Sequence, residues 1–208
     1  MSTYAVIDFE TTGMSPDLGA RATEVAIVLI DNGRVVDRYQ SLMNAGAFIP
    51  YEIQALTGIT NAMVRSAPRA EEVMREAADF VGSWPLVAHN AAFDRKFWEA
   101  ELQRIGRRQA ADFVCSLLLS RRLVPDAPNH KLGTLVSTLR LPATGRYHRA
   151  LADAEATANL FVHLGQTLQQ RFRLPALSLE LLLAVQKAPR FQLDRCVDRF
   201  RARLGGAA

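Results

Sequence analysis

The N-terminal part of the chain alternates short apolar runs with polar turns, which is typical of β-strands. Residues 3–9 form the first run, and residues 21–30 form a second that is rich in β-branched side chains. The turn Asp31-Asn-Gly33 follows, and Asn-Gly readily adopts the positive φ angles of a tight hairpin. A third strand over residues 34–42 is therefore predicted to run antiparallel to the second.

Helical periodicity dominates the rest of the chain. Residues 50–66 are predicted as loop with short helical pieces. The elements predicted beyond them are a helix from Pro68 through Val81, a strand at 84–88, a helix capped by Asn90 and ending near Gly106, a strand at 112–115, and helices at 117–123, 131–141 and 150–170. Strands first, then helix–strand units, then helices favour an α/β domain with helices packed on a mixed sheet.

Pro175 marks a predicted boundary. Residues 1–174 are expected to form the main domain, and residues 175–208 a helical C-terminal extension with two helices. The second of these helices places Leu193, Val197, Phe200 and Leu204 on one stripe. That stripe could dock onto a partner protein such as a polymerase subunit, or it could simply pack on the domain itself.

Composition narrows the class of protein. The chain has 208 residues, of which 49% are hydrophobic and 22% charged, as in an ordinary globular protein. No apolar run approaches the ~20 residues of a membrane span, and the N-terminus has no signal-peptide pattern. Cys115 and Cys196 lie far apart without partners, so they predict reduced thiols in a cytoplasmic protein. The lack of a long apolar run predicts no membrane partner. The formal net charge of +4 suits a polyanionic partner.

Two acidic residues end the first strand. Because side chains alternate faces along a strand, Asp8 and Glu10 point the same way, with Phe9 turned to the other face. Paired carboxylates repel each other, and a bound divalent cation is the usual reason to keep both ionised. The alternative is a strand end that reaches solvent with two hydrated acids.

Two further acidic residues begin helices, and one histidine precedes the second helix. Asp94 is in the first turn of the helix after the strand at 84–88, where α/β sheets collect ligands. Asp153 is in the first turns of the helix at 150–170, and His148 lies in the loop just before it. Each has an ordinary alternative, since an acid at a helix N-terminus complements the helix dipole and a loop histidine is often only solvated.

These residues fall into a family pattern. Ile7-Asp-Phe-Glu-Thr-Thr-Gly13, His89-Asn-Ala-Ala-Phe-Asp94 and His148-Arg-Ala-Leu-Ala-Asp153 resemble the three motifs of the DnaQ-like (DEDDh) 3′–5′ exonucleases, which include the epsilon subunit of DNA polymerase III. Asn129-His-Lys-Leu-Gly-Thr-Leu135 resembles the segment that usually precedes the third motif. The resemblance covers about residues 3–165 and implies an RNase H-like fold with a five-stranded mixed sheet flanked by helices.

The resemblance also implies a chemistry. Asp8, Glu10, Asp94 and Asp153 would be the catalytic ligands of two divalent cations, Mg²⁺ or Mn²⁺, and His148 would be the general base. The expected activity is hydrolysis of single-stranded or frayed DNA ends from the 3′ side, which releases nucleoside 5′-monophosphates. Its expected role is polymerase proofreading or DNA repair, with RNA or oligoribonucleotide trimming as the alternative. A second alternative is a non-catalytic module that docks onto a polymerase.

Substrate contacts follow from the same resemblance. The residues expected to hold the terminal nucleotide are Phe9, Thr11, Thr12, Gly13, Leu56, Ile59, Asn90 and His148. Among them, backbone amides of residues 11–13 would contact the terminal sugar, and Leu56 and Ile59 would pack near the terminal base. Arg146 and Arg149 flank His148 and could contact backbone phosphate, although solvation is an equal alternative.

Two departures from the family pattern bear on its biological role. Cys115-Ser116 occupies the place where many relatives have an Asp before a Ser or Thr, but this position is not a metal ligand. Gln192-Leu-Asp-Arg-Cys196 lacks the apolar end of the epsilon subunit's clamp-binding segment, which argues against a direct clamp contact.

Overall fold

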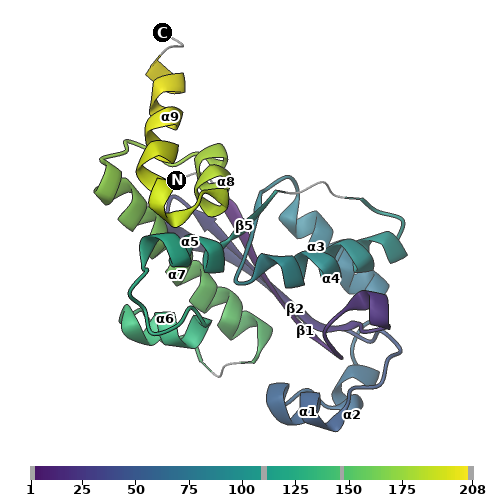
Figure 1. Ribbon diagram of the computed structural model, residues 1–208. Helices are drawn as coiled ribbons and strands as arrows, with labels where there is room; N and C mark the ends of the chain where they lie inside the picture. Colours follow the sequence, from purple (N-terminus) through teal and green to yellow (C-terminus); the bar gives the residue numbers. More distant parts are fainter. Residues whose placement is uncertain (1–2, 109–111, 146–147, 206–208) are drawn as a thin grey trace.

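A five-stranded mixed sheet forms the centre of the computed structural model, which describes residues 3–108, 112–145 and 148–205 (Figure 1). The strands are β1 (Tyr4–Thr11), β2 (Ala22–Asp31), β3 (Arg34–Leu42), β4 (Leu86–Ala88) and β5 (Phe113–Cys115), in the spatial order β3-β2-β1-β4-β5. The first three strands pair antiparallel, and β4 and β5 join them in parallel. The predicted α/β class and RNase H-like sheet are confirmed.

The β2–β3 hairpin forms as its turn residues require. Asn32 and Gly33 have φ angles of 49° and 81°, the left-handed values that Asn-Gly accepts readily. Two strand boundaries differ from the prediction by two residues, and others by one. β1 continues through Thr11, so both of its acidic residues lie within the strand. β4 begins at Leu86 and not at Trp84, because the Trp84 N–H still donates to the Val81 carbonyl at the end of the preceding helix.

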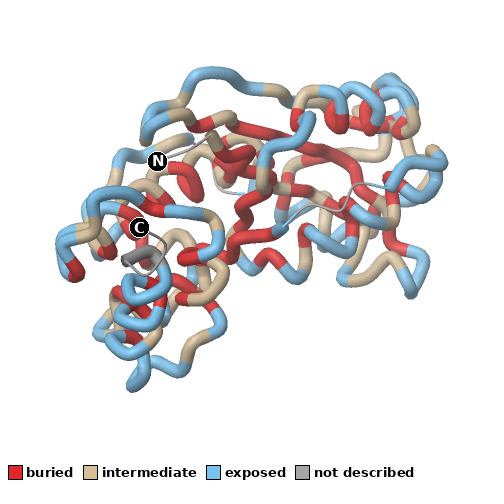
Figure 2. Tube along the Cα trace, turned by 90° about the horizontal axis from the view of Figure 1, so that it is seen from above, coloured by how far each residue is buried: buried red, intermediate tan, exposed pale blue. Residues whose placement is uncertain are grey.

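The helices cover both faces of the sheet. Their bounds are α1 Tyr51–Thr57, α2 Asn61–Arg65, α3 Ala70–Val81, α4 Ala91–Arg104, α5 Ser116–Leu123, α6 Leu132–Thr138, α7 Ala150–Phe172, α8 Leu179–Lys187 and α9 Leu193–Gly205, with short 3-10 turns η1 Pro16–Leu18 and η2 Arg190–Gln192. Figure 2 shows buried segments through the middle of the molecule and exposed segments around them. None of the helices in the described ranges combines the length and apolar character needed to span a membrane.

Alternation along β1 decides which helices each side chain meets. Tyr4 and Val6 belong to a core shared with α7, whereas Ala5, Ile7 and Phe9 belong to the core on the α3–α4 face. By the same period of two, Asp8 and Glu10 continue the α7 face. The strand therefore directs its two acids toward the helix that contains Asp153.

The C-terminal helices pack on the domain. Leu181, Leu182 and Val185 of α8 are buried in the core on the α7 side, and so are Leu193, Val197 and Phe200 of α9. These three α9 residues are the described part of the predicted stripe, since the side chain of Leu204 lies outside the described residues. The described part of the stripe is covered by the protein itself and offers no free docking face. The division into residues 1–174 and 175–208 remains a prediction.

Candidate active site

The acidic pair of β1 occupies the strand as predicted. Asp8 and Glu10 are both partly exposed, while Phe9 between them is buried, with its ring centroid 6.5 Å from that of Trp98. A bulge interrupts the pairing with β2 between Glu10 and Thr11. At its C-terminal end the strand thus separates a polar face, on which the acids lie, from an apolar face that anchors it.

Asp94 lies close to Asp8 and Glu10, at the start of the helix that follows β4. β4 runs parallel to β1, so the chain leaving β4 enters α4 at the edge where β1 also ends. Asp94 is in the first turn of α4 and is only 3% exposed. Its Oδ1 accepts a hydrogen bond from the Phe9 N–H at 3.2 Å. This bond fixes the α4 carboxylate against the backbone between Asp8 and Glu10.

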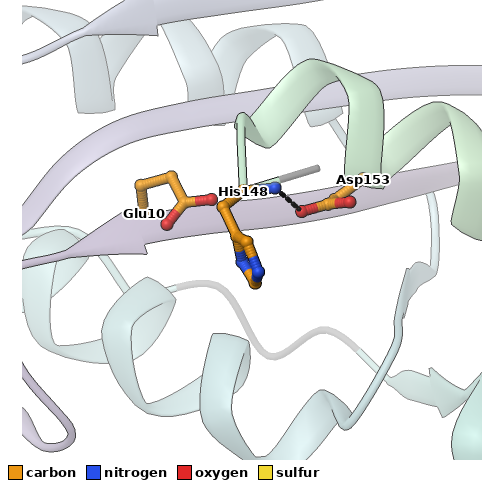
Figure 3. Close-up of side chains that lie close together, drawn as sticks. All are labelled: Glu10, His148 and Asp153. Carbon is orange, nitrogen blue, oxygen red and sulfur yellow. Dashed lines mark hydrogen bonds between the residues drawn. The ribbon is translucent and has the colours of Figure 1, made fainter. Parts of the chain in front are cut away.

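The third part of the site comes from the start of α7. The His148 N–H donates to Oδ2 of Asp153 at 2.9 Å (Figure 3), and His148 is exposed with a left-handed φ of 61°. One ligand atom from each of Glu10, His148 and Asp153 lies within 4.8 Å of the others, close enough to surround one ion. Residues of the first and third motifs, far apart in the sequence, therefore lie close together, and Asp94 of the second motif binds the backbone of the first.

Burial and charge repulsion raise the pKa values of the acidic residues. Burial, and then the neighbouring carboxylates of Asp94, Asp153, Glu10 and Glu24, raise the pKa of Asp8 well above its usual range. Burial followed by Asp153 raises the pKa of Glu10 to about 8, and burial raises the pKa of Asp94 to about 7. Such a cluster is costly to ionise alone, because each charge destabilises its neighbours.

The donor set fits a hard divalent cation. Oδ1 of Asp153 is buried and has no hydrogen-bond partner among the described residues, although a buried carboxylate oxygen normally has one. The other groups facing it are carboxylates and one imidazole, and oxygen-rich sites suit Mg²⁺ and Mn²⁺. A cation here would satisfy the free oxygen and relieve the repulsion among the acids.

Sequence reasoning missed Glu24. This residue is fully buried, and β1–β2 pairing sets it directly opposite Glu10. It accepts bonds from the Arg149 guanidinium at 3.1 and 2.8 Å, from the Ala150 N–H at 3.0 Å and from the Gln40 side chain at 2.7 Å. A lone acid within an apolar, β-branched strand was the signal available in the sequence. Glu24 ties the start of α7 to the sheet beneath the site.

Arg149 takes part in this tie. Its guanidinium is bound to Glu24, and its charge partly offsets the rise in the pKa of the neighbouring Glu10. This pairing favours a structural role over the predicted phosphate contact. Arg146, its predicted companion, lies outside the described residues. His89, which directly follows β4, is also held within the protein, by Ser116 Oγ at 2.9 Å and the His130 carbonyl at 2.9 Å.

The loop after β1 holds itself in place. Thr11 Oγ1 donates to the Gly13 carbonyl at 2.7 Å, and Thr12 Oγ1 accepts from the Arg21 N–H at 3.0 Å. The Thr12 N–H donates to the Arg21 carbonyl, so it is already occupied and less available to a terminal sugar. The remaining predicted contacts of residues 11–13 with a sugar stay predictions.

The predicted base contacts separate into an exposed and a buried residue. Leu56 is 49% exposed, but Ile59 is fully buried with Ile49 and Val64 in a small cluster of its own. Ile59 therefore supports the α1–α2 segment and has no surface to offer a base. Phe9 is buried in the same way and can only support the strand.

Asn90 corrects a prediction. It precedes α4, but its side chain makes no capping hydrogen bond, because the residue has a left-handed φ of 68°. Its exposed position leaves the amide available at the rim of the site. Its predicted role in substrate binding stays a prediction.

Comparison with known proteins places this geometry in a family. An exonuclease family model, RNase T, matches residues 5–161. Relatives include the PolC-type DNA polymerase III of Oceanobacillus iheyensis, 39% identical over 170 residues, and that of Caldanaerobacter subterraneus subsp. tengcongensis, 36% identical over 167 residues. These matches cover 81% and 80% of this chain but only 12% of each relative.

Solved structures give the same result. Exonuclease X in complex with 5′ overhanging duplex DNA aligns with a TM-score of 0.70 and 27% identity, over 88% of this chain and 99% of that one. The nuclease domain of 3′hExo, a DEDDh family member bound to rAMP, aligns with a TM-score of 0.68 and 20% identity, over 79% of this chain and 92% of that one. The chain belongs to the RNase T exonuclease family, of the DnaQ-like (DEDDh) type that its three motifs predict.

Proposed function

We propose that this chain is a metal-dependent 3′–5′ exonuclease that acts on single-stranded or frayed DNA. The observation that supports it most is the convergence of Glu10, His148 and Asp153 within 4.8 Å, with one Asp153 oxygen buried and unpartnered. Asp8 and Asp94 complete a set of four carboxylates whose mutual repulsion favours bound cations.

The residues of the site would have different roles in the reaction. Asp8, Glu10, Asp94 and Asp153 would hold two divalent cations, Mg²⁺ or Mn²⁺. Such a pair of cations stabilises the attacking and leaving oxygens of an in-line displacement at phosphorus. His148 is exposed in the loop before α7, with its side chain free to accept the proton of the attacking water. The bond from phosphorus to the 3′ oxygen of the preceding nucleotide breaks, that oxygen takes a proton from solvent, and a nucleoside 5′-monophosphate is released.

DNA is the favoured substrate because two kinds of relative act in DNA metabolism by name. The PolC-type relatives are DNA polymerases, and exonuclease X was solved with duplex DNA. Association with a polymerase, for proofreading or repair, is proposed on the same basis. RNA remains the alternative substrate, because four carboxylates and a histidine do not distinguish the sugar.

A 5′-labelled single strand of DNA and the matched RNA, incubated with Mg²⁺, test the proposal. The expected product is a ladder that shortens one nucleotide at a time from the 3′ end. A chelator or the substitution Asp8→Ala should abolish it, and Glu155→Ala, a control at a partly buried position on α7 that pairs with Arg38, should not. Shortening of the RNA alone would move the proposal to RNA ends, and no digestion of either strand with Mg²⁺ or Mn²⁺ would refute it.

A further inference from the structure

A basic hollow lies beyond the active site, where the C-terminal helices meet the rest of the domain. It has a volume of about 520 Å³ and is lined by Arg122, Pro125, Arg171, Arg190, Phe191 and Asp194. The residues come from the end of α5, the end of α7 and the turn η2 that leads into α9. Most of them follow residue 161, where the match to the exonuclease family ends.

The three arginines of the hollow differ in the groups that they bind. Arg122 is fixed, because its Nε donates to the Ala188 carbonyl at 2.9 Å and its Nη1 to the Leu118 carbonyl at 2.8 Å. Arg171 forms an exposed ion pair with Asp194 at 3.3 Å. Arg190 is exposed, with no carboxylate partner among the described residues. One acid thus faces three guanidinium groups, which leaves a net positive hollow suited to phosphate.

An aromatic ring borders the same hollow. Phe191 is 84% exposed, although burial of a phenylalanine ring is strongly favourable. Its neighbour in the chain is Arg190. An exposed ring beside arginines is the arrangement on which single-stranded nucleic acids stack their bases while the backbone is neutralised. A peptide partner would instead need apolar pockets, and the lining contributes only Phe191 and Pro125 as apolar residues.

Helix α5 lies between the residue that follows β4 and the hollow. It begins at Ser116, whose Oγ lies 2.9 Å from Nδ1 of His89 at the end of β4, and it ends near Arg122. Eight residues at a rise of 1.5 Å make this helix about 12 Å long. Figure 1 shows α5 between α6 on one side and α8 and α9 on the other.

A second hollow lies along the same helix, nearer to the catalytic acids. Its volume is about 550 Å³, and Asn90, Arg121 and Lys131 are among its lining residues. No acidic residue lines it. Arg121 and Arg122 are consecutive in α5, so the two hollows border the same helix and the same loop, 124–131. Arg121 and Lys131 of the second hollow and Arg122 of the first therefore lie on α5 and at the end of the loop that follows it.

We propose that a single-stranded nucleic acid, whose 3′ end lies at the carboxylate site, passes over α5 and is bound a second time in the hollow of Arg122, Arg190 and Phe191. The phosphates contact the arginines, and a base stacks on Phe191. This inference rests on the proposed function for the position of the 3′ end. A second contact raises the effective concentration of a long strand at the active site without any change at the carboxylates.

Nucleic acids of two lengths distinguish binding at the hollow from binding at the active site alone. Binding is measured by fluorescence anisotropy in chelator, and turnover with Mg²⁺, on strands of roughly 4 and roughly 20 nucleotides. The double substitution Arg190→Ala, Phe191→Leu should weaken binding of the long strand by about tenfold. It should raise KM for the long strand alone, and turnover of the short strand should be unchanged. Loss of the Arg190 contact should also lower the slope of log K against log salt by about 0.7.

Three matched variants sharpen the test. Arg34→Ala removes an exposed cation at the opposite edge of the sheet and should change nothing. Phe191→Trp keeps a stacking surface and should bind as the wild type does. Asp194→Asn removes the one acid of the hollow and releases Arg171, so it should tighten binding of the long strand.

The proposal is overturned by equal losses on both strand lengths, by an equal loss in Arg34→Ala, or by no loss at all. Tighter binding of a poly-glutamate peptide than of DNA, lost in the double variant, would assign the hollow to an acidic protein instead. A wild-type protein that binds the long strand through Phe191 but digests neither strand would refute the exonuclease function and leave this site intact. Thermal melts of each variant exclude misfolding as the cause.

Discussion

Glu24 and Glu10 face each other directly across β1 and β2, one fully buried and the other in the active site. Two acids in this position would repel each other, but the Arg149 guanidinium binds the buried one at 2.8 Å. The ion pair thus stabilises the sheet and fixes the residue that follows His148. The stability of the sheet and the position of the candidate site residue His148 therefore depend on the same contact.

Removing the buried partner should therefore be costly. Glu24→Ala leaves the Arg149 charge and the Ala150 N–H without their acceptor, and loss of one member of a buried pair costs about 3–5 kcal/mol. Since Arg149 is 35% exposed in its side chain, the lower end of this range is expected. Urea denaturation measures the change. Glu155→Ala, which breaks an exposed pair with Arg38, is the control and should cost about 1 kcal/mol or less; equal losses would contradict the assignment.

Stability without metal should fall as pH rises. The folded-state pKa values of Glu10 and Asp94 are raised to about 8 and about 7, so between pH 4.5 and 8 the folded protein binds more protons than the unfolded chain. The free energy of unfolding in chelator should then decrease across this window. Denaturation at several pH values checks it, and a flat profile would show that the acids do not interact in this way.

Metal should reverse this trend. Cations compete with protons for the same carboxylates, so Mg²⁺ or Mn²⁺ should bind more tightly at pH 8 than at pH 6 and release protons on binding. The melting temperature with and without Mg²⁺ at both pH values measures the effect. The stabilisation by metal should be larger at the higher pH and should disappear in Asp8→Asn.

Asp94 allows stability and activity to be separated. Asp94→Asn keeps an oxygen to accept the Phe9 N–H but removes a buried charge, so the metal-free protein should be more stable at pH 8 while activity is lost. Asp94→Ala leaves the Phe9 N–H unpaired and should destabilise by about 1–3 kcal/mol. Thermal melts in chelator compare the two, and a destabilised Asp94→Asn would contradict the raised pKa of Asp94.

Substitutions of His148 and Asp153 should have different effects on activity and on stabilisation by metal. His148→Ala should lower kcat by about 10²–10⁴, the usual contribution of a general base, while Mn²⁺ still raises the melting temperature. Asp153→Ala should abolish both the activity and the shift. Turnover of a single strand and melting with Mn²⁺ measure the two effects; loss of the shift in His148→Ala would make the imidazole a metal ligand instead.

Sequence patterns predicted the acidic residues whose positions depend only on strand periodicity and on where helices begin. The positions of Asp8 and Glu10 on one face follow from the period of two, and Asp94 and Asp153 follow from helix starts. Glu24 could not be assigned in the same way, because its burial depends on Arg149, which is 125 residues away in the chain. Ile59 was misplaced because a turn residue's burial depends on which neighbours fold over it, here Ile49 and Val64.

The Asn90 prediction was wrong in one respect for a related reason. Residue type favours a side-chain cap, but the path from β4 into α4 requires a left-handed backbone that turns the side chain away. The exposure of Phe191 could not be predicted from the sequence either, because Phe191 is there only one apolar residue near a helical stripe.

The division of β1 between two cores also limits how the sequence can change. Deleting a single residue between Tyr4 and Ile7 would shift the strand by one position and turn every following side chain to the opposite face. The acids of positions 8 and 10 would then enter the apolar core around Trp98, while Phe9 would replace them beside α7. Length variation in this protein is therefore confined to its connecting loops, and the strand itself can tolerate substitution but no insertion or deletion of one residue.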